Sequence, residues 1–303
     1  MEDYSTTLTM KGKVLSWDDW CDIFGDYSFF EDLVHEIFDV NKLGDITNYN
    51  NVTLGTNAVF RVNDFIVKIF VPKETRIWDS DDFHQEKTSV TEAIVSGIKT
   101  PNIVCCGTLK KLQSWDYIVF DYIEGDELGN VLSGLYEDDK DRVIVQLKDF
   151  LDKFNVLRET SFDKFMGLNN GRWHSYERRL IDDVIIYLNN LEFETYRVHG
   201  DLTKENVLYD GDVFVIDFAD STVAPRCYEY PAIGFDLFDY DLEMTQNLFE
   251  DNFPDLISNL LNGLLIHDFG GDMLGIILKR LYIDKSEIHT VNDVKNAIID
   301  IMR

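Results

Sequence analysis

Residues 198–220, VHGDLTKENVLYDGDVFVIDFAD, contain oxygen-bearing side chains at spacings that could hold a metal ion and move a proton. Asp201 ends the triplet HGD, Asn206 follows it by five residues, and Asp217 comes after a short apolar run. Hard cations such as Mg²⁺ take oxygen ligands, usually one or two carboxylates together with the phosphate oxygens of a substrate. A further carboxylate near a reacting hydroxyl can act as a general base. These residue types therefore suit a site for a nucleotide-bound metal.

A β-hairpin would bring these side chains together. The apolar runs VLY and VFVI flank Asp-Gly-Asp at residues 210–212, which is a strong turn signal. Folding this hairpin places residues 204–206 opposite residues 216–217, so an amide and a carboxylate converge with Asp201 one loop away. Each residue taken singly would also fit a polar hairpin with a capping histidine, whereas the complete set favours a site.

The N-terminal part of the chain is predicted to be strand-rich. The runs VFRV and FIVKIF, on either side of Asn63 and Asp64, predict a hairpin that ends at Pro72. A polar helix is predicted over residues 81–98, and NIVCCGTL and DYIVFDYI predict two further strands separated by a Lys-rich turn. Residues 1–45 hold short, helix-like runs of aromatic and acidic residues, to which the sequence assigns no role.

After Gly125 the pattern becomes helical. Apolar residues recur at helical spacing in two stripes: Val143, Leu147, Phe150, Phe154 and Leu157, then Leu180, Ile181, Val184, Ile185 and Leu188. The segments DLISNLLNGLLIHDF and KNAIIDIM repeat the pattern. A strand-rich first part, a connector near DYIEGD and a helical second part indicate a bilobal α+β architecture.

The charge of the chain limits its partners. Lys and Arg number 28 against 56 Asp and Glu, which gives a net charge of −28. Such a charge repels nucleic acid and anionic membrane surfaces and attracts cations, so neither nucleic acid nor a membrane is expected as a partner. This negative charge has two interpretations: a solvated surface, or a surface that recruits a cationic ligand. Only the location of the acidic residues distinguishes between them.

Cysteine usage and hydropathy indicate the compartment. The four cysteines, Cys21, Cys105, Cys106 and Cys227, form no C-x-x-C pair and have no histidine at a ligand spacing, so neither a zinc site nor a disulfide framework is expected. The N-terminus has no apolar signal region, and no apolar run reaches the length of a membrane span. We therefore expect a cytoplasmic protein.

The order H-G-D-x-x-x-x-N followed by I-D-F resembles the catalytic and metal-binding loops of the protein-kinase-like fold. HGD in place of HRD is similar to the aminoglycoside phosphotransferase family and its choline kinase branch. The resemblance covers residues 52–240 and implies a β-rich N-terminal nucleotide-binding lobe over residues 1–120. It further implies a hinge at 121–125 and a mainly helical C-terminal lobe at 126–303, which carries the catalytic loop and the acceptor site.

A kinase-like site also needs a lysine on a strand and a glutamate on a helix. Lys68 lies inside the apolar run FIVKIF, where an isolated buried ammonium would be costly without an anionic partner. The resemblance implies that Lys68 holds the α- and β-phosphates and that a glutamate orients it. Glu86 is preferred over Glu92, because it precedes Gly97 by eleven residues, as in the family.

The remaining nucleotide contacts follow from the resemblance. Backbone groups of Asp121 and Ile123 would bind the purine, and backbone amides at Gly55 and Asn57 would cover the phosphates. The segment 54–60 has one glycine rather than G-x-G-x-x-G, which departs from the protein-kinase pattern and resembles the shorter loop of antibiotic kinases. No A-P-E signature occurs, which argues against a protein substrate.

The resemblance implies transfer of the γ-phosphoryl of ATP or GTP to a hydroxyl of a small molecule. Asp201 would accept or orient the hydroxyl proton, Asn206 and Asp217 would hold Mg²⁺, and His199 would buttress the loop. The sequence leaves open whether ATP or GTP is the donor.

Acidic residues after Asp217 would suit a polycationic amino sugar, and hence an aminoglycoside resistance enzyme. The residues proposed to bind the acceptor are Asp220, Glu229, Asp236 and Asp268, and the same wall would include Asp239 and Asp241. Trp173 and Tyr176 either border this site or belong to the core. Two alternatives stay open: a kinase of choline, an amino alcohol or a sugar, and a non-catalytic nucleotide-binding module.

Overall fold

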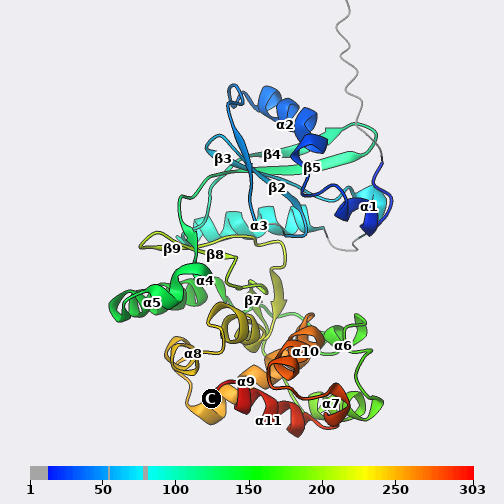
Figure 1. Ribbon diagram of the computed structural model, residues 1–303, viewed down its shortest axis with the longest axis vertical. Helices are drawn as coiled ribbons and strands as arrows, with labels where there is room; N and C mark the ends of the chain where they lie inside the picture. The colour runs from blue at the N-terminus through cyan, green and yellow to red at the C-terminus, as the bar shows by residue number, and fades with distance from the viewer. Residues whose placement is uncertain (1–12, 54, 78–80) are drawn as a thin grey trace, which may run out of the picture. The chain divides into compact units, whose positions relative to one another are not determined.

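The computed structural model describes residues 13–53, 55–77 and 81–303 (Figure 1). These residues form two compact units. Unit 1 takes the described residues up to Ile94 together with Thr100–Glu124, and unit 2 takes Val95–Lys99 with Gly125–Arg303. The first twelve residues of the predicted N-terminal lobe, and Leu54 of the proposed phosphate loop, lie outside the described residues.

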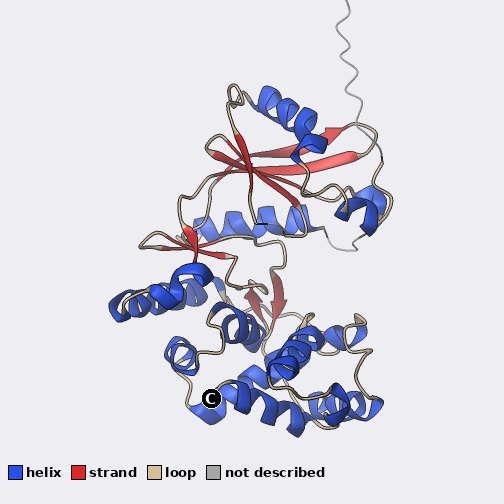
Figure 2. Ribbon diagram, in the orientation of Figure 1, coloured by secondary structure: helices blue, strands red, loops and turns tan. Residues whose placement is uncertain are grey.

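Unit 1 is built on a five-stranded antiparallel sheet with the order β1-β2-β3-β5-β4 (Figure 2). Its strands are β1 (Tyr49–Asn51), β2 (Ala58–Val62), β3 (Phe65–Ile69), β4 (Ile103–Lys110) and β5 (Ser114–Asp121). Asn63 adopts a φ of 53° in the β2–β3 turn, which the hairpin geometry requires and which asparagine tolerates. The predicted hairpin and the two further strands are confirmed.

Helices cover both faces of this sheet. Alternation along β3 places Val67 and Ile69 on one face, in a core shared with α1 (Trp17–Cys21) and α2 (Tyr27–Asn41). Lys68 therefore faces the other way, toward α3 (Asp82–Val95), and Figure 1 shows α2 and α3 on opposite sides of the sheet. A short η1 (Lys73–Thr75) follows β3. The polar helix predicted over residues 81–98 is thus present, with a shorter C-terminal end.

Unit 2 is mainly helical (Figure 2). Its α-helices are α4 (Leu128–Val131), α5 (Glu137–Phe154), α6 (Met166–Asn169), α7 (Arg178–Asn189), α8 (Leu242–Phe249), α9 (Phe253–Ile266), α10 (Gly270–Arg280) and α11 (Val291–Ile301). Short helical turns complete it: η2 (Leu132–Gly134), η3 (Arg226–Glu229), η4 (Ala232–Leu237) and η5 (Lys285–Glu287). With the sheet of unit 1, this confirms the predicted α+β class. None of the helices among the described residues is long and apolar enough to cross a membrane.

The predicted helical stripes are largely buried. On α7, Leu180, Val184 and Leu188 are buried, whereas Ile181 and Ile185 are half-buried. Val143, Leu147, Phe150 and Phe154 lie on α5 and are buried. Leu157 does not belong to this helix, because the chain leaves it after Phe154, and Leu157 is 52% exposed and bridges to Tyr196 instead. The expectation that Leu157 continues the stripe was therefore wrong.

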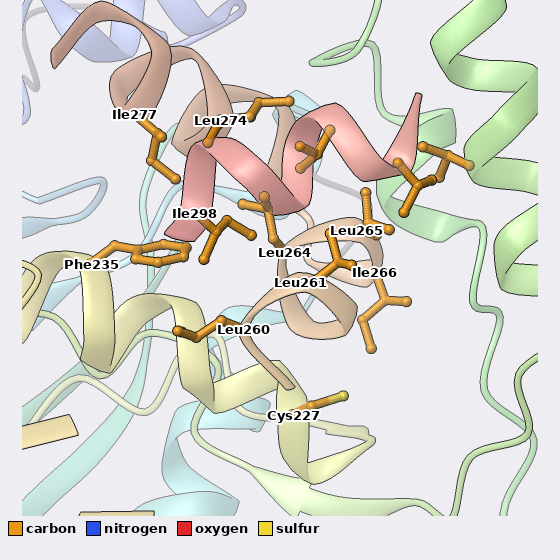
Figure 3. Close-up of a cluster of buried hydrophobic side chains, with 14 of the residues drawn as sticks. Cys227, Phe235, Leu260, Leu261, Leu264, Leu265, Ile266, Leu274, Ile277 and Ile298 are labelled. Atoms are coloured by element: carbon orange, nitrogen blue, oxygen red, sulfur yellow. The ribbon is translucent and has the colours of Figure 1, made fainter. Parts of the chain in front are cut away.

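The largest core of unit 2 lies around α9. Figure 3 shows Leu260, Leu261, Leu264 and Leu265 of α9 gathered with apolar side chains of α10 and α11. Trp173 and Tyr176 belong to the same core, being 2% and 6% exposed.

Two small sheets carry residues 198–220. β7 (Tyr196–Val198) pairs with β10 (Thr222–Ala224), and β6 (Asp126–Glu127) pairs with the hairpin of β8 (Val207–Tyr209) and β9 (Val213–Val215). The loop after β7 and the loop after β9 are therefore both anchored at their ends. The predicted hairpin is confirmed, with its turn at residues 210–212.

Candidate functional site

The hairpin of β8 and β9 places Asn206 and Asp217 next to each other. The pairing of Val207 with Val215 continues one step further, because the Ile216 N–H donates to the Asn206 carbonyl at 3.0 Å. Asp217 then leaves the strand with a left-handed φ of 58°. Aspartate, like asparagine, adopts this conformation more often than other non-glycine residues, and residues held in it are frequent at functional sites.

Asp201 and Asn206 are joined by hydrogen bonds. The Asn206 Nδ2 donates to Asp201 Oδ2 at 2.7 Å and to the Asp201 carbonyl at 2.8 Å. Because both bonds use the amide nitrogen, the Asn206 Oδ1 is directed away from Asp201 and keeps its acceptor capacity. The structure therefore brings together the three residues that the sequence predicted to converge.

The carboxyl of Asp201 lies in an environment that favours its neutral form. Burial raises the pKa of Asp201 to about 7, with further increases from the charges of Asp220 and Asp217 and a smaller one from Asp236. The hydrogen bond from Asn206 opposes this rise. A carboxylate with a pKa near neutrality is well matched to general-base work at physiological pH.

His199 supports the loop and is not poised to take a proton. Its Nδ1 accepts the Asp201 N–H at 3.3 Å, so the ring proton must lie on Nε2, which donates to the Ile216 carbonyl at 3.1 Å. The side chain is fully buried and packs against Phe218 at 4.7 Å between ring centroids. Both ring nitrogens therefore make hydrogen bonds, one within the HGD loop and one to Ile216, which follows β9.

Gly200 fits a position that a side chain could not occupy. Its φ is 84°, and a Cβ at this residue would lie 2.7 Å from the Asp220 carbonyl oxygen. The Gly200 carbonyl accepts from His267 Nε2 at 3.1 Å. His267 is buried, and burial lowers its pKa to about 4, so it is neutral and donates from a fixed nitrogen. The positive φ and the close approach of the Asp220 carbonyl therefore explain why the middle residue of the HGD triplet is glycine.

Glu229 lies beneath the HGD loop and does not face an acceptor. It is 1% exposed, and its carboxylate accepts the His199 N–H at 2.5 Å and the Gly200 N–H at 3.2 Å. Asn155 Nδ2 adds a longer bond at 3.4 Å. Burial raises the pKa of Glu229 to about 7, and these hydrogen bonds oppose the rise. Its predicted place in an acceptor-binding wall was therefore wrong, because its oxygens are used inside the protein.

Sequence reasoning missed this supporting layer under the loop. His267 stands in an apolar run, and Asn155 follows the last residue of α5; neither has a motif around it. A buried glutamate that pairs with backbone N–H groups leaves no spacing pattern, because its partners are thirty and twenty-nine residues away. In the sequence, the one signal for this layer was a polar residue, His267, inside an apolar segment.

The donor set at this loop fits a magnesium ion. Among the described residues no three His, Cys, Asp or Glu side chains gather closely enough to hold a metal by themselves. One carboxylate and one amide oxygen, from Asp217 and Asn206, match the incomplete protein shell that Mg²⁺ uses when substrate phosphates supply the rest. The charges of Asp217 and Asp220 repel that of Asp201, and a cation bound there would relieve this repulsion.

Unit 1 holds the predicted lysine and glutamate as a buried ion pair. Lys68 Nζ lies 2.8 Å from Glu86 Oε2, and the two side chains are 4% and 2% exposed. Glu92, the alternative partner on α3, is exposed. Burying both charges carries a desolvation cost, and buried ion pairs of this kind are frequent at functional sites.

The other predicted nucleotide contacts also lie in unit 1. Gly55 is exposed and Asn57 is 4% exposed, in the loop that leads into β2. Asp121 ends β5, and its two carboxylate oxygens accept the N–H and Nδ2 of Asn102 at 2.5 and 2.8 Å. Its side chain is thus occupied, and its backbone N–H donates to the Asn102 carbonyl at 3.1 Å, which leaves its carbonyl oxygen as the group to consider for a ligand. Ile123 is partly buried and follows the strand end.

The acidic residues predicted to bind the acceptor fall into two groups, those near the HGD loop and those with partners elsewhere. Asp220 and Asp236 are close enough to raise the pKa of Asp201, and Asp236 Oδ1 also accepts the Lys204 N–H at 3.0 Å. Asp268 is partly buried beside His267 and its N–H donates to the Tyr228 hydroxyl at 3.2 Å. Burial raises the pKa of Asp268.

Asp239 and Asp241 have other partners. Asp239 pairs with Arg280 at 2.8 Å, and Asp241 caps α8 by accepting the Met244 N–H at 2.9 Å.

A cavity of about 670 Å³ in unit 2 is lined by Trp173 and Tyr176 with residues of α6 and α7, and its lining contains none of the acidic residues. Three carboxylates, Asp220, Asp236 and Asp268, therefore remain near the HGD loop.

Solved structures with the same fold include known phosphotransferases. The GDP complex of wild-type aminoglycoside 2'-phosphotransferase-IIIa matches with a TM-score of 0.63 at 15% identity, over 90% of this chain and 98% of that one. A choline/ethanolamine kinase family protein from Mesorhizobium loti matches with 0.58 at 13%, over 89% and 92%. The streptomycin-ATP-APH(2")-IIa ternary complex matches with 0.52 at 16%, over 76% and 86%. At these identities the likeness establishes the protein-kinase-like fold.

A search of the curated proteins found no match to the chain. The family model described as the phosphotransferase enzyme family, APH, matches residues 51–246, which is more than half of the chain and includes the HGD loop, the hairpin and the Lys68–Glu86 pair. The sequence resemblance is thereby confirmed, and the chain belongs to the APH phosphotransferase enzyme family.

Proposed function

We propose that this protein transfers the γ-phosphoryl group of ATP or GTP to a hydroxyl of a cationic small molecule, an aminoglycoside. The observation that carries the proposal is the HGD loop, in which Asn206 bonds the Asp201 side chain, the charge of Asp217 acts on it, and its pKa is raised to about 7. Phosphoryl transfer requires positioning and charge stabilisation more than covalent chemistry from the protein, and this arrangement suits those tasks.

Each site residue has a proposed task. Asp201 orients the acceptor hydroxyl and accepts its proton as the bond to phosphorus forms. Asn206 and Asp217 hold Mg²⁺, which when bound neutralises charge on the β- and γ-phosphates. His199 and Glu229 keep the loop in place through its backbone. Asp201 is therefore the one member of the set that contacts the acceptor.

The nucleotide contacts are proposed for the first part of the chain. Lys68, oriented by Glu86, holds the α- and β-phosphates, and backbone amides at Gly55 and Asn57 cover them. Backbone groups of Asp121 and Ile123 bind the purine. In this proposal residues 1–120 form the nucleotide-binding lobe, 121–125 the hinge, and 126–303 the acceptor lobe.

Acidic residues near the loop support a cationic acceptor. Of the acidic residues predicted to bind the acceptor, Asp220 and Asp236 act on the charge of Asp201, and Asp268 follows His267, which bonds the Gly200 carbonyl. Solved relatives of the same fold are described with streptomycin and ATP and with GDP, which supports a nucleotide donor and an aminoglycoside acceptor. A kinase of choline, an amino alcohol or a sugar is the alternative, since a choline/ethanolamine kinase family protein shares the fold.

A test of the proposal measures nucleoside diphosphate release by the purified protein with Mg²⁺, ATP or GTP, and a panel of aminoglycosides, choline and neutral sugars. Release that depends on an aminoglycoside, and an acceptor KM that rises steeply with added salt, are expected, because salt screens the attraction between a polycation and exposed carboxylates. Release with choline or a sugar alone would favour the alternative. A protein that binds nucleotide without release from any acceptor would contradict the enzymatic proposal for these compounds.

A further inference from the structure

A hydrogen bond joins the N-terminal helix α1 to the loop that precedes β2. The indole Nε1 of Trp20 donates to the carbonyl oxygen of Thr56 at 2.8 Å. Thr56 stands between Gly55 and Asn57, whose backbone amides are the proposed phosphate contacts. A residue from the segment that the sequence left without a role is therefore bonded to the centre of this loop.

The donor side of this bond is held rigidly. Trp20 is 0% exposed, and its ring packs against Phe30 and Phe24 at centroid distances of 6.0 and 6.3 Å. Ser16 caps the start of α1 by accepting the Asp19 N–H at 3.1 Å. Burial and these ring contacts hold the indole in one position.

Two reciprocal hydrogen bonds tie the start of this segment to the sheet. The Val14 N–H donates to Gln113 Oε1 at 2.8 Å, and Gln113 Nε2 donates to the Val14 carbonyl at 2.8 Å. Val14 and Gln113 are 1% and 7% exposed, so these bonds are shielded from water. Helix α1 is thereby attached to the turn between β4 and β5.

The acceptor side is much more open. Gly55 and Thr56 are exposed, and a Cβ built at Gly55 would meet no atom within 4 Å. Packing around Gly55 therefore does little to set the orientation of this backbone. The Trp20 bond therefore holds the exposed part of this segment, next to the buried Asn57.

The geometry of a peptide group carries this fixed point to the phosphate contact. The Thr56 carbonyl and the Asn57 N–H belong to one planar trans peptide, so they point in opposite directions. Holding the carbonyl toward Trp20 directs the Asn57 N–H away from α1. A hydrogen-bonded carbonyl also polarises its peptide, which makes the N–H a better donor to an anion.

We propose that Trp20 is a positioning residue for the phosphate-binding loop, acting through the Thr56 carbonyl to orient the Asn57 N–H toward the nucleotide phosphates. This inference rests on the proposed function, because it assumes that residues 55–57 cover phosphates. It gives α1 a role in nucleotide binding, and it does not require Trp20 to contact the nucleotide.

The test compares Trp20→Phe with Trp115→Phe. Both residues are tryptophans of the same core, 0% and 1% exposed, and both pack against Phe30. The Nε1 of Trp115 has no hydrogen-bond partner among the described residues, so its replacement removes an indole without removing a hydrogen bond. The pair of variants therefore separates the hydrogen bond from the loss of packing. Urea unfolding of each variant records the packing loss.

Binding of a non-hydrolysable ATP analogue with Mg²⁺, and of adenosine, would be measured by calorimetry for both variants and the wild type. Trp20→Phe should lower the affinity for the ATP analogue by about two- to tenfold relative to Trp115→Phe. This is the change expected from the loss of one hydrogen bond. Adenosine affinity should be equal in the two variants, because adenosine has no phosphate. Hydrogen exchange of the free protein should be faster over residues 55–58 in Trp20→Phe alone.

Equal affinity of the two variants for the ATP analogue would overturn the inference while leaving the proposed function intact. If Trp20→Phe lost as much affinity for adenosine as for the ATP analogue, the inference would also be overturned, because the loss would point to general damage to unit 1. A wild-type protein that binds neither compound would instead overturn the proposed function, and the inference with it.

Discussion

At the scale of single residues, the account depends on how the surroundings of Asp201 set its proton affinity. Burial raises the pKa of Asp201 to about 7, and the charges of Asp220 and Asp217 add to the effect. Only the ionised form can accept a proton from a hydroxyl. The fraction of active enzyme should therefore increase as pH rises through this pKa.

This predicts the pH dependence of kcat/KM. Without saturating Mg²⁺, kcat/KM should rise tenfold per pH unit below about pH 7 and level off above it. More Mg²⁺ should move the rise to lower pH, because a nearby cation favours the carboxylate. Asp220→Asn should shift it the same way by removing one repelling charge, whereas Asp212→Asn, in the exposed turn, should not. A profile that is flat from about pH 5 to pH 8 would contradict the role of Asp201.

Glu229 provides a second prediction at this scale. Glu229→Ala should lower the free energy of unfolding by about 2–4 kcal/mol, because it leaves the buried N–H groups of His199 and Gly200 without an acceptor. Turnover should fall as well, because the loop that holds Asp201 loses its support. The exposed Glu192, replaced by alanine, serves as the control.

The contribution of Glu229 should also depend on pH, with a sign that follows from its pKa. Burial raises the folded-state pKa from 4.5 to about 7, so the folded protein binds an extra proton between these values. The stability difference between wild type and Glu229→Ala should be largest below pH 4.5 and should decline as pH rises through about 7. Urea unfolding at several pH values would measure it, and a difference that grew with pH would contradict the assignment.

At the scale of elements, α3 and β3 are joined through the Lys68–Glu86 pair. Glu86→Ala leaves a buried ammonium without its partner and should cost about 3–5 kcal/mol of stability, together with nucleotide affinity. Glu92→Ala, on the exposed face of the same helix, should change neither.

A double variant makes this prediction sharper. Lys68→Met with Glu86→Leu removes both charges, so it should recover most of the lost stability without recovering nucleotide affinity. Thermal unfolding and calorimetric titration with ATP would measure the two properties. Recovery of both would show that the pair is structural only.

Elements with strong local signals could be predicted from the sequence. The turns at Asn63 and Gly211 fixed two hairpins, since turn residues and alternating apolar residues both act over a few positions. The end of α5 could not be predicted, because Leu157 keeps the helical spacing while the chain turns to pair with Tyr196. Helix ends depend on such tertiary contacts as well as on periodicity.

At the scale of the whole molecule, some site residues have their partners close by in the sequence, and others have them far away. Asp201, Asn206 and Asp217 could be predicted because they share one hairpin and a recognisable spacing. Glu229 could not be assigned correctly, since nothing in its local sequence tells that its oxygens turn inward to His199. Composition has the same limit: a net charge of −28 does not tell which carboxylates are already paired inside the protein.

The central claim is that this chain moves a phosphoryl group to a small-molecule hydroxyl with Asp201 as base. The most direct test follows the label from γ-labelled ATP into an aminoglycoside, with wild type, Asp201→Asn and the control Asp212→Asn. Asp212 is exposed in the hairpin turn and pairs with Lys99 at 2.7 Å, so its replacement should leave transfer unchanged.

We expect labelled aminoglycoside from the wild type and from Asp212→Asn, and a loss of about a hundred- to ten-thousand-fold in the rate for Asp201→Asn with ATP affinity retained. Transfer by Asp201→Asn at the wild-type rate, or label that appears only as inorganic phosphate in every sample, would contradict the account.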